Sequence, residues 1–130
     1  MDTLLGSMRI SSSGMSAERF RMDVISSNIA NAGSVGTGGK HPYRRREVEF
    51  SGGEDGVQVT GIVEDQRPFL RVPDPGNPDA GPDNCVEHSN VQPIEEMINM
   101  MGASRAYEAN IAAFNAARGM IKNALNIGKV

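Results

Sequence analysis

Residues 93–127 read PIEEMINMMGASRAYEANIAAFNAARGMIKNALNI, with no proline after the first position. Nine positions in this stretch follow one another in alternating steps of three and four residues, and seven of the nine are apolar or aromatic. The nine are Met97, Met100, Ser104, Tyr107, Ile111, Phe114, Arg118, Ile121 and Leu125. This spacing is typical of a long α-helix that packs along its length against another helix.

A second stripe, made mostly of small residues, lies beside the first on the same predicted helix. It comprises Gly102, Ala106, Ala109, Ala113, Ala116, Met120 and Ile127, and Asn123 interrupts it. Pro93 and the two glutamates at 95 and 96 suit the first turn of a helix, and Gly128 can end it. One partner helix cannot cover two adjoining stripes, so we expect this helix to need further neighbours.

Residues 2–32 form the second periodic segment, in which six of eight regularly spaced positions are apolar. The eight are Leu4, Met8, Ser11, Met15, Glu18, Met22, Ile25 and Ile29. They predict a helix capped by Asp2 or Thr3. Its weak point is SSSG at 11–14, because a glycine in a helix interior costs about 1 kcal/mol. Both a kink and a complete interruption by a turn are compatible with that composition.

Residues 33–92 differ in character, with ten glycines, six prolines and no helical period. We expect short strands at 43–50, 57–63 and 69–72, a turn over 51–56 and an exposed loop over 74–84. The fold class that follows is mainly α with a small β-rich insert. The long terminal helices are expected to pack as an antiparallel, coiled-coil-like pair, and the irregular insert between them to carry a β-hairpin.

The composition limits the classes of partner. The net charge is -3, and residues 33–92 carry ten acidic against six basic residues, so nucleic acid and anionic lipid are not expected as partners. No stretch approaches the roughly 20 apolar residues of a membrane span, and no cleavable secretory signal opens the sequence. We therefore expect either a cytoplasmic protein or one exported by a route that reads no such signal.

Three groups of residues suggest chemical sites, and each lacks the required spacing. GTGGK at 36–40 lacks the glycine spacing of a phosphate-binding loop, and His41 stands where that loop needs Ser or Thr. Cys85, His88 and His41 cannot close a zinc site without a carboxylate and carry no signal of a nucleophile–base pair. The Asp and Asn residues of 74–84 lack calcium-loop spacing. We predict no catalytic residue, no cofactor and no metal.

Arg44, Arg45 and Arg46 form the densest run of charge. Alternation along a strand would send Arg44 and Arg46 to one side and Arg45 to the other, with Glu47 and Glu49 close enough to neutralise them. A solvated or salt-bridged strand edge and a contact with an acidic partner surface both fit this run.

The supply of large apolar residues is thin, with six aromatics and no tryptophan. Burying one stripe of each helix does not by itself offset the conformational entropy lost when both backbones become ordered. We therefore expect the two helices to order fully only within an assembly.

Two long motifs resemble those of the bacterial flagellar axial proteins, the family of rod, hook and hook-associated proteins. SSGMSA at 12–17 and DVISSNIANA at 23–32 are similar to the amino-terminal motif of that family. NVQPIEEM at 90–97, ASRAYEAN at 103–110 and AFNAA at 113–117 are similar to its carboxy-terminal motif. Together with PYRR at 42–45 and GIVED at 61–65, the resemblance covers nearly the whole chain and is closest to the proximal rod subunits.

This resemblance implies a structural subunit of the flagellar basal-body rod, the periplasmic drive shaft that transmits motor torque and surrounds the export channel. It implies assembly with copies of itself and with other rod proteins, and contact with the MS-ring and rod-base adaptor proteins. It also implies export by the flagellar type III apparatus without a cleaved signal. In domain terms, 1–32 and 93–130 would form the inner-tube helices, and 33–92 a Gly/Pro-rich hairpin and loop insert.

The expected site residues are contact residues, not chemical groups. On the amino-terminal helix, those expected to pack between subunits are Leu4, Met8, Met15, Met22, Ile25 and Ile29. On the carboxy-terminal helix they are Met97, Met100, Tyr107, Ile111, Phe114, Ile121 and Leu125. The family motif itself contributes Asn28, Ala30, Asn31, Arg105, Tyr107, Glu108 and Asn110. The rival interpretations are another short rod subunit and, from a different class, a small enzyme using Cys85 and a histidine.

Overall fold

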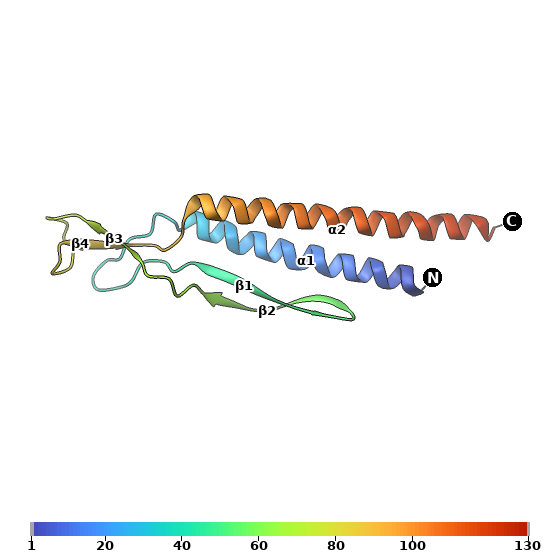
Figure 1. Ribbon diagram of the computed structural model, residues 1–130, viewed down its shortest axis with the longest axis horizontal. Coiled ribbons are helices and arrows are strands. Elements are labelled where there is room, and N and C mark those ends of the chain that lie inside the picture. Colours follow the sequence, from blue (N-terminus) through green and yellow to red (C-terminus); the bar gives the residue numbers. More distant parts are fainter. Residues whose placement is uncertain (1, 130) are drawn as a thin grey trace. The chain divides into compact units, whose positions relative to one another are not determined.

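The computed structural model describes residues 2–129. It contains two long helices and, between them in the sequence, two antiparallel β-hairpins (Figure 1). In chain order the elements are α1 (Asp2–Ala30), β1 (Arg46–Gly53), β2 (Gly56–Glu64), β3 (Leu70–Pro73), β4 (Cys85–His88) and α2 (Pro93–Ile127). The expected fold class, mainly α with a small β-rich insert, is confirmed. Among the described residues, neither helix has a stretch long and apolar enough to cross a membrane.

Both helices lie where the hydrophobic period placed them. α2 begins at Pro93 and ends at Ile127, as predicted, and α1 ends at Ala30, two residues before the expected boundary. The capping prediction was wrong, because Asp2 and Thr3 already lie inside α1.

The strands agree with the prediction less closely. β1 begins at Arg46 and not at Tyr43, since the backbone N–H of Tyr43 donates to Ser34 Oγ (2.9 Å) and that of Arg45 donates to Asn90 Oδ1 (2.7 Å). β1 also continues to Gly53, so the turn is shorter than expected. β4, four residues long, was not predicted; it pairs with β3 in the register Leu70↔His88 to Pro73↔Cys85.

The chain divides into two compact units. The described residues of unit 1 are 2–22, 48–61 and 101–129, and those of unit 2 are 23–47 and 62–100. Each unit therefore draws on both helices and on the insert between them.

In unit 1 the two helices meet through small side chains. Gly14 of α1 is buried against Asn110 of α2, where a Cβ on Gly14 would lie 2.7 Å from the Asn110 amide. Ala17, Ala103 and Ala117 are the buried apolar residues of this unit. Ala103, Asn110 and Ala117 are spaced by sevens, so they lie on one line along α2. We call this line, where α2 meets α1, the seam. The line of Met97, Ile111 and Leu125 occupies the next heptad position.

The interruption by a turn that the composition of residues 11–14 allowed is absent, because α1 is one continuous helix there. Ser11 is buried, as is Gly14. Ser13 Oγ donates to the Ile10 carbonyl (2.7 Å) and accepts the backbone N–H of Val57 in β2 (3.0 Å). The small residues that weaken the helix in isolation are the ones that let α2 and the hairpin approach it.

Gly14→Ala tests this close approach. Ala normally stabilises a helix interior by up to about 1 kcal/mol relative to Gly. At Gly14 we expect the opposite sign, a loss of about 1–3 kcal/mol, because the new methyl group would displace the Asn110 side chain and its hydrogen bond to the Ala106 carbonyl. The measurement is urea unfolding of the purified subunit by far-UV circular dichroism, in trimethylamine N-oxide to favour the compact state.

Gly6→Ala is the matched control, since nothing lies within 4 Å of a Cβ at that position of α1. It should be neutral or stabilising. The double variant Gly14→Ala, Asn110→Ala should recover most of the loss. An equal gain in stability at both glycines would show that the two helices do not touch at Gly14.

Candidate functional site

A buried group of charged and polar side chains lies in unit 2, centred on Arg45 and Glu96. Arg45 is 5% exposed and Glu96, in the first turn of α2, is 0% exposed. Arg45 Nε donates to Glu96 Oε1, and Arg45 Nη1 donates to Glu47 and to Asp65 Oδ2, the latter at 3.2 Å. One guanidinium is thus shared by three carboxylates, from the insert and from α2.

Asn28, near the end of α1, completes this group. Its amide nitrogen donates to the Arg46 carbonyl (2.8 Å) and to Glu96 Oε2 (3.2 Å). Its amide oxygen accepts the hydroxyl of Tyr43 (2.8 Å) and the backbone N–H of Arg46 (3.1 Å). Asn28 is fully buried with both ends of its amide satisfied, so it joins α1 to the insert and to α2.

Asn90 plays a similar role on the other side of Arg45. Its oxygen accepts the Arg45 backbone N–H, and its nitrogen donates to the carbonyls of Asp65 and Arg67, each at 3.1 Å. Arg67 in turn pairs with Asp65 (2.8 Å) and with Glu95 (3.1 Å). Among the described residues, no buried side-chain nitrogen or oxygen lacks a hydrogen-bond partner.

The pKa shifts follow from these contacts. Burial alone would lower the pKa of the Arg45 guanidinium, but its ion pairs with Glu96 and Glu47 outweigh burial and hold that pKa above its usual range. Burial alone would raise the pKa of Asp65, but hydrogen bonds from Arg67 and Arg45 outweigh it and lower the pKa. Burial raises the pKa of Tyr43. Arg45 and Asp65 are therefore stabilised in their ionised forms, which suits a structural role.

The expected alternation of the arginine run is confirmed, with one correction. Arg45 is buried. The guanidinium of Arg44 lies over the ring of Phe69, 4.2 Å from its centroid, and that of Arg46 lies over Tyr43, 5.4 Å from its centroid. Arg45 turns into the unit and is salt-bridged to Glu47, Asp65 and Glu96, whereas Arg46 is exposed. Sequence reasoning missed the pair with Glu96 because it assigned Glu96 to the helix dipole. Glu96 continues the line of 103, 110 and 117 by one heptad, but the sequence does not single out that line as the buried one.

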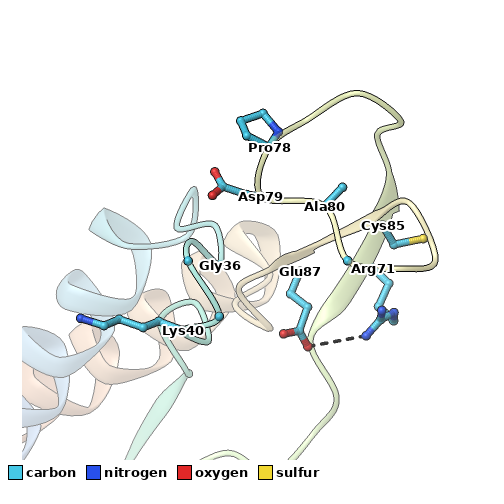
Figure 2. A pocket seen from close by; sticks show the side chains of 11 residues that line it. Gly36, Lys40, Arg71, Pro78, Asp79, Ala80, Cys85 and Glu87 are labelled. Atoms are coloured by element: carbon cyan, nitrogen blue, oxygen red, sulfur yellow. Dashed lines mark ion pairs between the residues drawn. The ribbon is translucent and has the colours of Figure 1, made fainter.

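Residues from the three candidate groups for chemistry line one groove of unit 2: Gly36 and Lys40, Asp79, and Cys85. The groove has a volume of about 270 Å³, and Arg71 and Glu87 also line it. In Figure 2 a dashed line joins Arg71 to Glu87 (3.8 Å), and the Lys40 side chain points away from both. His41 pairs with Glu87 (3.0 Å) and stacks on Phe69. Within residues 2–129 no three Cys, His, Asp or Glu side chains gather as a metal would require.

The predicted packing residues fall into three groups by burial. Ile25 is buried, and the half-buried ones are Leu4, Met8, Met15, Met22, Ile29, Met100, Tyr107, Phe114 and Ile121. Met97 and Leu125 are more than half exposed, and Ile111 is exposed. Of the motif residues, Asn28 and Asn110 make contacts between the helices, whereas Ala30, Asn31, Arg105 and Glu108 are exposed.

Two family models match the regions that hold these contacts. The "Flagella basal body rod protein" model matches residues 8–36, and the "Flagellar basal body rod FlgEFG protein C-terminal" model matches residues 84–127. The flagellar basal-body rod protein FlgC of Bacillus subtilis (strain 168) is 39% identical, over 98% of this chain and 99% of that protein. FlgC of Salmonella typhimurium (strain LT2) is 37% identical, over 97% and 98%. The chain belongs to the FlgC family of flagellar basal-body rod proteins.

Membership of the FlgC family confirms the resemblance drawn from the motifs and the function that it implied. The chain is a proximal rod protein of the flagellar basal body, and the family is structural, not enzymatic. Asn28 and Gly14 lie in the first matched region, and Glu96 and Asn110 in the second. The contacts between the helices are therefore built from the parts of the chain that the two rod-protein models match.

Removing one member of the buried ion pair should be costly. Arg45→Met leaves Glu96 buried without its cation, so we expect a loss of about 3–5 kcal/mol in unfolding free energy. Replacing both, Arg45→Met with Glu96→Leu, should recover part of that loss, because no uncompensated charge is left. Arg71→Met, at an exposed ion pair, is the control and should cost at most about 1 kcal/mol. Equal losses at Arg45 and Arg71 would contradict the buried pair.

Acid should destabilise unit 2 through Asp65. Its pKa is lowered by folding, so its contribution is fully present above the unfolded value near about 4 and is lost as pH falls through the lower folded value. We expect the urea midpoint to fall between about pH 5 and about pH 2. Asp65→Asn should flatten that dependence, whereas Asp55→Asn, in the exposed hairpin turn, should leave it unchanged. If the urea midpoint of Asp65→Asn falls with pH as steeply as that of the wild type, the acid response comes from other carboxylates.

Proposed function

We propose that this FlgC-family subunit polymerises through the outward faces of α1 and α2 into the tube of the proximal rod. The two helices then form the inner-tube domain around the export channel, and the assembled rod transmits motor torque. Residues 33–92 remain a hairpin and loop insert on that domain. This proposal adds a mechanism of assembly to the family function.

The observation that carries the proposal is the distribution of side-chain size around α2. The seam within the chain consists of Glu96, Ala103, Asn110 and Ala117, whereas several large apolar residues of α2 are exposed. In unit 2, Met97 is 55% and Ile98 64% exposed; in unit 1, Met101 is 58% and Leu125 54% exposed. A helix pair that buries small residues and leaves several large ones exposed keeps apolar surface available for neighbouring subunits.

The partners follow from this arrangement and from the family. We propose that the outward faces contact copies of this subunit and other rod subunits, with the rod-base adaptor proteins of the MS ring at one end. We also propose export by the flagellar type III apparatus without a cleaved signal. The thin seam within the chain supports such a route, because a subunit with few large residues buried against itself gains most of its order on incorporation.

Met97→Asp and Leu125→Asp test the outward face. Both side chains are exposed in the subunit, so each variant should keep its unfolding free energy within about 0.5 kcal/mol. In cells that lack their own copy, we expect the variant subunits to be exported but absent from purified basal bodies, and the cells to be non-motile. A carboxylate buried between subunits without a cation carries a large desolvation penalty.

Met97→Leu and Leu125→Met are the matched controls, since they keep an apolar side chain of similar volume and should support motility. Ile25 and Phe114 are less suitable positions, because they are buried or half-buried inside the chain and an aspartate there would disturb the subunit itself. Normal rods containing Met97→Asp and Leu125→Asp subunits would refute this packing face.

A further inference from the structure

The heptad line of α2 that contains Met97, Ile111 and Leu125 also carries basic charge towards the end of the helix, which apolar packing does not explain. We call it the outward line of α2. Arg118 occupies a heptad position where Met97, Ile111 and Leu125 are large and apolar and Ser104 is small. Lys122 and Leu125 follow it at steps of four and three, so the three share one face of the helix. No basic residue lies in the last turn of α2, so complementing the helix dipole does not account for these cations. We name Arg118 and Lys122 the basic face.

Both residues of the basic face are exposed in unit 1. The ion pairs within residues 2–129 involve neither of them. An anionic surface outside the helix pair is the partner that such a face would recognise.

The same unit presents a surface of opposite sign, which we name the acidic turn: Glu49, Glu54 and Asp55 of the β1–β2 hairpin. All three are exposed, and residues 48–61 contain no lysine or arginine. None of the three takes part in an ion pair within the described part of the chain.

The acidic turn is held in place on α1. The backbone N–H of Val57 donates to Ser13 Oγ (3.0 Å), and Gly56, with φ of 114°, lies directly against Ser13. A side chain at Gly56 would collide with that serine, so the hairpin approaches α1 closely at this point. The carboxylates are therefore presented from a fixed position and not from a free loop.

We propose that the acidic turn of one copy docks on the basic face of α2 in a second copy. The inference rests on the proposed function, because it requires copies of the subunit to be neighbours in the rod. The alternative of two hairpins pairing edge to edge would place carboxylates against carboxylates. A contact between two different surfaces of the same chain is heterologous, and such contacts repeat into rings or helical filaments, as a tube requires.

Cysteine cross-linking tests the proposal directly. In a Cys85→Ser background, which removes the only cysteine, Glu54→Cys and Lys122→Cys subunits are expressed together in cells lacking their own copy. Mild oxidation of purified basal bodies should give a disulfide-linked dimer only when both variants are present, since the two Cα atoms must come within about 7 Å. Glu54→Cys with Arg19→Cys, an exposed position of α1, is the control and should give none.

Charge reversal provides an independent test. Glu54→Lys with Asp55→Lys, or Arg118→Glu with Lys122→Glu, should each lower the subunit recovered in basal bodies by about tenfold. Combining all four reversals in one chain should restore recovery. Rods that contain both cysteine variants without the cross-link, or a combined variant that stays defective, would overturn the docking and leave the proposed function intact. Absence of the unmodified subunit from basal bodies would instead overturn the proposed function.

Discussion

The structure of unit 2 depends on one buried ion pair, Arg45 with Glu96. Taking a guanidinium and a carboxylate out of water is costly, and the cost is offset only when both are paired and their remaining hydrogen-bonding groups are satisfied. Asn28 donates a further hydrogen bond to Glu96, and Arg45 makes further ion pairs with Glu47 and Asp65. The end of α1, the insert and the start of α2 therefore have one geometry in which no charge is left unpaired.

In unit 1 a steric constraint determines how the elements pack. Close approach of the helices requires Gly14 opposite Asn110, and close approach of the hairpin requires Gly56 opposite Ser13. Small residues consequently fill the seam, and several large apolar residues of α2, among them Met101 and Leu125, are exposed. The helices thus pair by polar and steric complementarity, and the exposed apolar side chains are the surface that the proposed assembly would cover.

The sequence predicted the elements better than it predicted their contacts. Both ends of α2 were predictable, because Pro93 suits the first turn and Gly128 directly follows the last helical residue. The period could not decide which of several adjoining lines meets α1, since Ala103 and Ala117 carry no hydrophobic signal comparable to Met97 or Phe114. β4 was missed because four residues show no alternation. Arg45 and Glu96 were noticed separately, but a pairing across 51 residues of sequence is visible only in three dimensions.

The central claim is that the seam within the subunit is small and polar while the outward apolar line of α2 is covered by neighbours. A density map of an intact basal body, at a resolution that shows side chains, tests it most directly. The account predicts Met97, Ile111 and Leu125 within about 4.5 Å of apolar atoms of adjacent rod subunits, and Gly14 still against Asn110 of its own chain. Those three side chains facing solvent, with Ala103 and Ala117 against a neighbouring subunit, would contradict it.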